Sequence, residues 1–184
     1  LAEADLDKTV ERILNFIFRY TDNRMEATFD READHLMAQK VAEESMVLLK
    51  NDGILPLAAD KKIAFIGKFA AKPRFQGGGS SHINSFKVTS ALDAVKDYAN
   101  ITYAQGYDVV EDVVDEALLD EAVTAAKEAD VAVVFAGLPD KFECEGYDRD
   151  HLRMPNCQNT LISEILKVQK NVVIVLHNGS PIEM

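Results

Sequence analysis

Four short apolar runs alternate with segments of helical periodicity, and this alternation restricts the possible folds more than any other feature of the sequence. The runs cover residues 63–66, 101–104, 131–137 and 172–176. Three of them are continuously apolar, which is typical of strands that are buried on both faces of a sheet. Such strands occur in parallel sheets with helices on each side. We therefore predict an α/β fold, a three-layer α/β/α sandwich with a mostly parallel sheet and right-handed crossovers.

The predicted helices lie before and between these strands. Apolar residues recur at three- and four-residue steps from the start of the chain to a turn at residues 21–23, which predicts a first helix. A second helix is expected to begin after Asp30, a favourable N-cap, and to end at residues 51–53, where Gly can form the C-cap. Ser90 begins a capping-box pattern, so a further helix is expected through Ala99. The later helical patterns lie at residues 119–126 and 161–168.

Two long segments without periodicity follow predicted strands directly, at residues 68–86 and 138–155. Because the carboxyl ends of parallel strands lie at one edge of a sheet, we expect both loops at that edge, where open α/β sheets bind ligands. Loops of this length without secondary structure of their own are commonly functional. The sequence therefore predicts a site between these two loops.

The second long loop is rich in ionisable side chains, which include Glu143, Glu145, Asp148 and Arg149. Three interpretations are open: a solvated acidic loop, a calcium site and an acid/base site. Calcium is disfavoured because the spacing does not match an EF-hand. In the acid/base interpretation, Gly146 frees the backbone beside Glu145, and Arg149 orients or charge-pairs a neighbouring carboxylate.

The first long loop contains a glycine-serine run at residues 77–81. It matches neither a P-loop nor a dinucleotide fingerprint, because Ser80 stands where Lys is required and His82 where Gly is required. The run is either a flexible surface turn or a close backbone approach to a ligand, with Ser80 or Ser81 donating a hydrogen bond. His177 follows the last strand, and we expect it to be packed and hydrogen-bonded rather than functional.

Composition excludes several classes of partner. The formal net charge of -11 argues against binding to nucleic acid or to an anionic membrane surface, because both kinds of binding need clustered Lys and Arg on the protein. The sequence has no apolar run of 18 residues or more, so no membrane span is expected. Cys144 and Cys157 do not form a CxxC pair, and no His stands at zinc spacing. We expect no metal, no cofactor and a reducing, cytoplasmic environment.

Five segments resemble, in the same order, parts of the second domain of family 3 glycoside hydrolases. They are residues 41–57, 77–81, 129–134, 145–149 and 178–183. The resemblance divides the chain into residues 1–27, similar to the last helix of a preceding (β/α)8 barrel with a linker, and residues 28–184, similar to the second domain truncated at its C-terminal end. The barrel itself is expected to lie outside this chain.

The resemblance implies a retaining, exo-acting β-glucosidase that hydrolyses a terminal β-D-glucosyl residue of a β-glucoside or a short β-linked oligosaccharide. Enzymes of this kind use an Asp nucleophile on the barrel and a Glu acid/base on the second domain. Glu145 aligns with that Glu, and Ser80 aligns with a serine that touches the sugar. The acid must hold its proton near neutral pH, so its pKa is expected to be raised.

Several alternatives stay open on the sequence alone. Glu143 competes with Glu145 for the acid/base role, and the resemblance favours Glu145, with Asp148 and Arg149 as supporting residues. The enzyme can be a β-xylosidase or another exo-β-glycosidase, because the barrel chooses the sugar. The chain can also be a non-catalytic ligand-binding or interaction domain. Without the barrel nucleophile, we expect this chain alone to be inactive.

Overall fold

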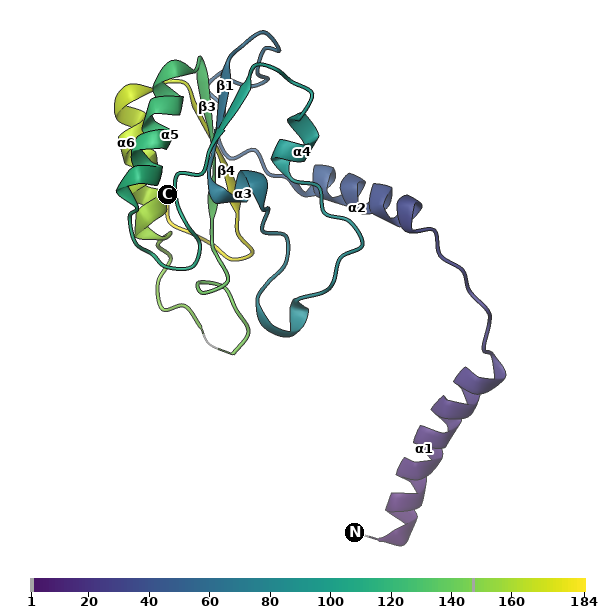
Figure 1. Cartoon of the computed structure of the whole chain (residues 1–184). Coiled ribbons are helices and arrows are strands. Elements are labelled where there is room, and N and C mark those ends of the chain that lie inside the picture. Colours follow the sequence, from purple (N-terminus) through teal and green to yellow (C-terminus); the bar gives the residue numbers. More distant parts are fainter. Residues whose placement is uncertain (1, 147) are drawn as a thin grey trace. The chain divides into compact units, whose positions relative to one another are not determined.

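A computed structural model describes residues 2–146 and 148–184 of the chain (Figure 1). Tyr147, which belongs to the 145–149 motif, and Leu1 lie outside the described residues. The chain divides into two compact units, Leu1–Met46 and Val47–Met184. The sequence predicts the division between residues 27 and 28, whereas the boundary of the compact units falls after Met46. The second helix therefore belongs to the first unit.

The first unit consists of the helices α1 (Glu3–Asp22) and α2 (Arg31–Ser45). Asp30 caps α2 as predicted, because its side-chain oxygen accepts the backbone N–H groups of Glu32 at 3.0 Å and Ala33 at 3.1 Å. Neither helix contains a buried residue.

The predicted end of the second helix is wrong. α2 ends at Ser45, and the backbone is extended at Met46, so Leu48 does not lie on the helix. Gly53 does have a positive φ, but it lies in a turn formed by Asn51, whose side-chain oxygen accepts the N–H group of Gly53 at 3.1 Å. A short apolar run fits helix and extended chain equally well by periodicity, and an Asn side chain competes locally for backbone groups.

The second unit is built on four parallel strands in the order β2-β1-β3-β4. They are β1 (Ile63–Ile66), β2 (Ile101–Ala104), β3 (Val131–Gly137) and β4 (Val172–His177). Every residue of β3 is buried. The structure confirms the predicted α/β class and the parallel sheet, because continuously apolar strands require cover on both faces.

Helices cover both faces of this sheet. Figure 1 shows α5 (Glu116–Glu128) and α6 (Asn156–Val168) together on one face, and the short helices α3 (Lys68–Ala71) and α4 (Ala91–Val95) on the other. Right-handed crossovers explain this arrangement, since the chain moves one way along the sheet from β1 to β2 and the opposite way from β2 to β3 and β4. The carboxyl ends of β1 and β3 therefore flank the point where the strand order reverses.

Two details of the predicted loops and helices are wrong. The segment 68–86 contains α3 and a single helical turn at Gly79–Ser81, and α4 ends at Val95 instead of Ala99. Elements of one turn are too short to produce a periodic pattern, and α3 is held by tertiary packing, which buries Phe69. The capping box at the start of α4 is present as predicted.

Two buried side chains hold the end of β3, from which the second long loop departs. The Tyr107 hydroxyl donates to the backbone carbonyl of Phe135 at 2.8 Å, and the side-chain oxygen of Gln158 accepts the N–H group of Gly137 at 2.8 Å. Hydrogen bonds in a buried, low-dielectric environment restrict the groups that make them. These bonds therefore define where the loop begins.

Candidate functional site

The two long loops lie side by side at the carboxyl ends of β1 and β3. Gly78 and Cys144 form an isolated parallel bridge, in which the N–H group of Glu145 donates to the carbonyl of Gly78 at 3.4 Å. The segment after β4 joins them, because the N–H group of Gly179 donates to Glu143 Oε2 at 3.0 Å. The sequence-based expectation that both loops share one edge agrees with this geometry.

Glu145 lies in an exposed position and faces the glycine-serine run. Its Oε2 atom accepts the backbone N–H group of Ser80 at 2.7 Å. Hydrogen bonds from the Ser80 side chain and backbone lower the pKa of Glu145 below its ordinary value. The expected upward shift of this pKa is therefore wrong for the chain as it stands. A raised pKa needs burial or a nearby negative charge, whereas this carboxylate is solvated and receives donors.

Gly79 makes the contact between Ser80 and Glu145 possible. Its φ is +87°, and a Cβ atom at this position would lie 2.7 Å from Glu145 Cβ and 3.0 Å from Glu145 Oε2. Only Gly combines this backbone conformation with so close an approach. Within this chain, the glycine-serine run makes a close backbone approach to a carboxylate.

Replacing Gly79 by Ala is expected to separate Glu145 from the Ser80 N–H group and to raise the pKa of Glu145 toward its ordinary value of 4.5. Gly53→Ala is the matched control, because Gly53 also has a positive φ (+96°), a Cβ there meets nothing within 4 Å, and Gly53 belongs to neither long loop. The measurement is an NMR titration of the Glu145 side-chain carboxyl in each variant. An unchanged pKa in Gly79→Ala would contradict this account of the contact.

Glu143 is engaged by the surrounding loops. Its side chain is 21% exposed, and its Oε2 atom lies 3.0 Å from Arg74 Nη1 and 3.0 Å from the N–H group of Gly179. Burial raises the pKa of Glu143, but hydrogen bonds from Ser180, Gly179 and Arg74 outweigh it and hold the pKa below the ordinary value. Glu143 is thus an ionised carboxylate with fixed partners, unlike the exposed Glu145.

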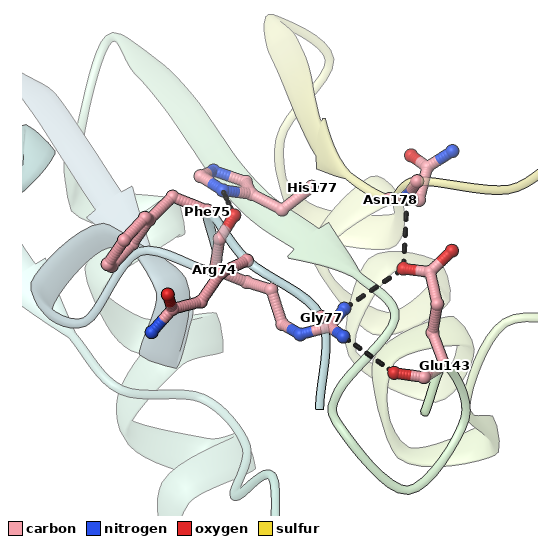
Figure 2. A pocket seen from close by; sticks show the side chains of 8 residues that line it. Arg74, Phe75, Gly77, Glu143, His177 and Asn178 are labelled. Carbon is pink, nitrogen blue, oxygen red and sulfur yellow. Dashed lines mark hydrogen bonds and ion pairs between the residues drawn. The ribbon is translucent and has the colours of Figure 1, made fainter. Parts of the chain in front are cut away.

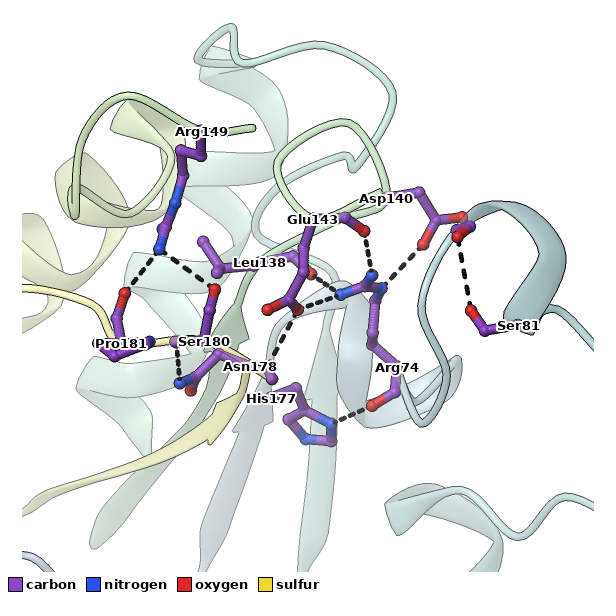
Figure 3. A network of polar contacts seen from close by, with 12 residues as sticks. Arg74, Ser81, Leu138, Asp140, Glu143, Arg149, His177, Asn178, Ser180 and Pro181 are labelled. Carbon is purple, nitrogen blue, oxygen red and sulfur yellow. Dashed lines mark hydrogen bonds and ion pairs between the residues drawn. The ribbon is translucent and has the colours of Figure 1, made fainter. Parts of the chain in front are cut away.

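Arg74 is a residue of this site that the sequence-based analysis missed. Its side chain is only 8% exposed, and its three guanidinium nitrogens all donate to the second long loop (Figure 3). The acceptors are Asp140 Oδ1 at 2.8 Å, the carbonyl of Leu138 at 2.5 Å, and both the side chain and the carbonyl of Glu143 at 3.0 and 2.8 Å. The signal in the sequence is an Arg three positions before the glycine-serine run, because the planar donor fork of Arg can bind several acceptors at once.

Arg149 holds the far end of the 143–149 segment. Its Nη2 atom donates to Ser180 Oγ at 3.3 Å and to the carbonyl of Pro181 at 2.6 Å, so Arg149 connects this loop to the segment after β4. Asp148 is exposed to solvent. The Ser81 hydroxyl donates to the carbonyl of Gly78 at 3.5 Å, so this hydrogen bond stays within the glycine-serine run.

A pocket of about 240 Å³ lies between the three loops (Figure 2). Arg74, Phe75, Glu143 and Asn178 contribute to its lining, together with His177. His177 lies 5.5 Å from the Phe69 ring between centroids, and its Nδ1 atom lies 3.4 Å from the Arg74 carbonyl oxygen. Burial lowers the pKa of His177, so it is neutral near pH 7. Its packed and hydrogen-bonded state agrees with the expectation from the sequence.

The described part of the chain contains neither a candidate metal site nor a membrane-spanning helix. Across residues 2–146 and 148–184, no cluster of three or more His, Cys, Asp or Glu side chains has an arrangement that could bind a metal ion. The helices formed by these residues are all too short or too polar to cross a membrane.

Taken together, fold and site define a doubly wound α/β domain that presents an exposed carboxylate at its switch point. Residues 46–184 match the sequence profile of the glycosyl hydrolase family 3 C-terminal domain. The chain therefore belongs to glycosyl hydrolase family 3, a family of glycosidases.

Individual relatives support this assignment. The chain is 49% identical to thermostable beta-glucosidase B of Acetivibrio thermocellus over all of its length and 25% of that enzyme's. It is 47% identical to an exo-alpha-(1->6)-L-arabinopyranosidase of Bifidobacterium breve, over 84% of this chain and 22% of the relative. A crystal structure of a Bifidobacterium adolescentis GH3 beta-glucosidase superposes with a TM-score of 0.90 at 40% identity, covering 100% of this chain and 27% of the other. The chain thus spans about a quarter of the length of these relatives.

Proposed function

We propose that this chain contributes the acid/base half of a retaining, exo-acting β-glucosidase and that Glu145 is its general acid/base. The observation that carries the proposal is the contrast between two neighbouring carboxylates. Glu143 is held by Arg74 and Gly179, whereas Glu145 is exposed beside Ser80 at the switch point of the sheet. Similarity to enzymes named as beta-glucosidases supports the proposed substrate class.

In this mechanism Glu145 first protonates the glycosidic oxygen while an Asp on a barrel domain attacks the anomeric carbon, so that the C–O bond to the leaving group breaks. Glu145 then removes a proton from water as the water attacks the glycosyl-enzyme. The two carboxyl groups of retaining enzymes lie roughly 5–5.5 Å apart. Ser80 is proposed to bind the sugar, with Ser81 beside it.

The same mechanism requires a change in the pKa of Glu145. In the chain itself, donors from Ser80 keep this pKa low. A barrel domain and a bound sugar would bury the carboxylate, and the nucleophile would add a negative charge nearby, and both effects raise a carboxyl pKa. If the Ser80 donors turn to the sugar, the remaining downward effect is also removed. The acid is therefore proposed to become competent only in the assembled site.

The experiment that tests the proposal is Glu145→Gln in the full-length enzyme, meaning the polypeptide that joins this chain to its barrel domain. Turnover of aryl β-glucosides with poor leaving groups should fall steeply, and turnover of activated ones should persist. Unchanged kinetics on all substrates would instead favour a non-catalytic ligand-binding domain. Xylosides and arabinopyranosides belong in the same assay, because one relative is named an arabinopyranosidase and another a probable exo-1,4-beta-xylosidase.

The 184-residue chain alone is expected to show no glycosidase activity. In the proposed mechanism the acid/base works with a nucleophile that this chain does not provide. The measurement is release of 4-nitrophenol from its β-glucoside by the purified chain, compared with a heat-denatured sample as background. Hydrolysis that is removed by Glu145→Gln would contradict the proposed division of the site between two domains.

A further inference from the structure

The segment that carries Glu145 is held on both sides of that residue. Two residues before it, Glu143 is bound to Arg74 and to the N–H group of Gly179. Four residues after it, Arg149 donates to Ser180 and Pro181. Glu145 lies between these two attachments and faces solvent. Besides its direct bonds with Ser80 and Gly78, the position of Glu145 therefore also depends on groups that do not touch it.

In the network drawn in Figure 3, the guanidinium group of Arg74 donates to three residues of the second long loop, Leu138, Asp140 and Glu143. It comes from the segment after β1, and it donates to both the side chain and the backbone carbonyl of Glu143 in the segment after β3. Through Glu143 it is linked to Gly179, in the segment after β4. One guanidinium group thus joins the segments that follow three strands.

The backbone contacts extend this connection to Glu145 itself. The carbonyl of Glu143 accepts from Arg74 Nη2 at 2.8 Å and from the Gly78 N–H group at 3.5 Å, and the N–H group of Glu145 donates to the Gly78 carbonyl at 3.4 Å. Arg74 and the glycine-serine run therefore fix the same short stretch of backbone from two directions. Displacements of about 1 Å in a catalytic group can cost about 10²-fold in rate.

We propose that Arg74, acting through Glu143, is the positioning residue for Glu145. This inference rests on the proposed function of Glu145 as general acid/base. An Arg is required because its planar fork reaches several acceptors at fixed angles, which the single ammonium of a Lys does not. Asp140 completes the arrangement by accepting from Arg74 Nε at 2.8 Å.

The test uses Arg74→Lys and Glu143→Gln in the full-length enzyme. Both variants keep side-chain size, but one removes the fork and the other removes the charge it binds. The matched control is Lys141→Met in the same loop as Glu143. It breaks an exposed ion pair of 2.5 Å with Glu111, which lies between β2 and α5, and leaves the contacts of Glu143 in place. For each variant, kcat/KM is measured with phenyl and 2,4-dinitrophenyl β-glucosides, and thermal unfolding is followed in parallel.

A misplaced acid slows the departure of phenol, a poor leaving group, more than that of dinitrophenol, which needs no protonation. We expect Arg74→Lys and Glu143→Gln to lower kcat/KM for the phenyl glucoside on the order of 10- to 100-fold, and for the dinitrophenyl glucoside less than about threefold. Lys141→Met should leave both values unchanged.

Equal losses on both substrates would overturn the inference, because they indicate a smaller folded fraction rather than a misplaced acid. Wild-type values in both variants would overturn it as well. If Arg74→Lys does not fold, Glu143→Gln alone decides between these outcomes. Glu145→Gln separates the two proposals: without leaving-group dependence there, the proposed function fails, and with it there but not in the Arg74 and Glu143 variants, only this inference fails.

Discussion

Under the proposed acid/base role, Glu145→Gln in the full-length enzyme is expected to lower kcat/KM for a phenyl β-glucoside by about 10²–10⁴-fold, the usual contribution of a general acid. Gln keeps the size and the acceptor oxygen of Glu145, so its bond from the Ser80 N–H group at 2.7 Å can persist. What the variant loses is the proton. The alkaline limb of the pH profile of kcat/KM should therefore disappear together with the rate.

Activated substrates distinguish this chemical loss from misfolding. With a 2,4-dinitrophenyl leaving group, bond cleavage needs no acid, and kcat/KM should stay close to wild type. The second step still lacks its base, so the glycosyl-enzyme should accumulate, and kcat and KM should fall together. Azide, an anion that attacks without a base, should restore kcat and yield a glycosyl azide.

Asp150→Asn is the matched control for Glu145→Gln. Asp150 belongs to the same loop, and its side chain is 95% exposed, so the substitution removes one acidic charge nearby without altering a buried contact. Its kinetics should match those of the wild type. A loss in Asp150→Asn equal to that in Glu145→Gln would contradict a specific role for Glu145 and indicate a general effect of loop charge.

Gly137→Ala is expected to destabilise the α/β unit on the order of 4 kcal/mol, from backbone strain and from steric overlap. Gly137 ends β3 with φ +141°, and a Cβ atom there would lie 2.1 Å from the carbonyl oxygen of His177 in β4. Because the obstacle is backbone, side-chain rotation cannot relieve it. Domains of this size are stable by about 5–15 kcal/mol, so the loss is a large part of the total.

The measurement is urea unfolding of the 184-residue chain, followed by circular dichroism. Gly53→Ala is the control, because Gly53 also has a positive φ (+96°) but a Cβ there meets nothing within 4 Å. The control should cost about 1 kcal/mol from strain alone. Equal midpoints for the two variants would show that the predicted overlap at β3 and β4 is relieved cheaply.

Much of the fold was predictable because its signals are local. Continuous apolarity marked the β3 run correctly, and the side chains of Asp30 and Ser90 marked two helix starts. Besides elements too short to give a pattern, the error at the end of α2 arises where one local pattern allows two structures. The run after Ser45 fits a helix by periodicity, but the structure leaves it, and the Asn51 turn that follows, outside any helix.

The sequence by itself determined the α/β class, the family and the segment that carries the candidate carboxylates, since these follow from apolar runs and short motifs. Only the tertiary structure showed that Glu143 is bound by Arg74 and Gly179, whereas Glu145 is exposed. Arg74 lies 69 positions before Glu143 in the chain. The role of a carboxylate depends on which donors reach it and how far water is excluded. Both depend on where the segments after β1, β3 and β4 meet in space, which no pattern of neighbouring residues records.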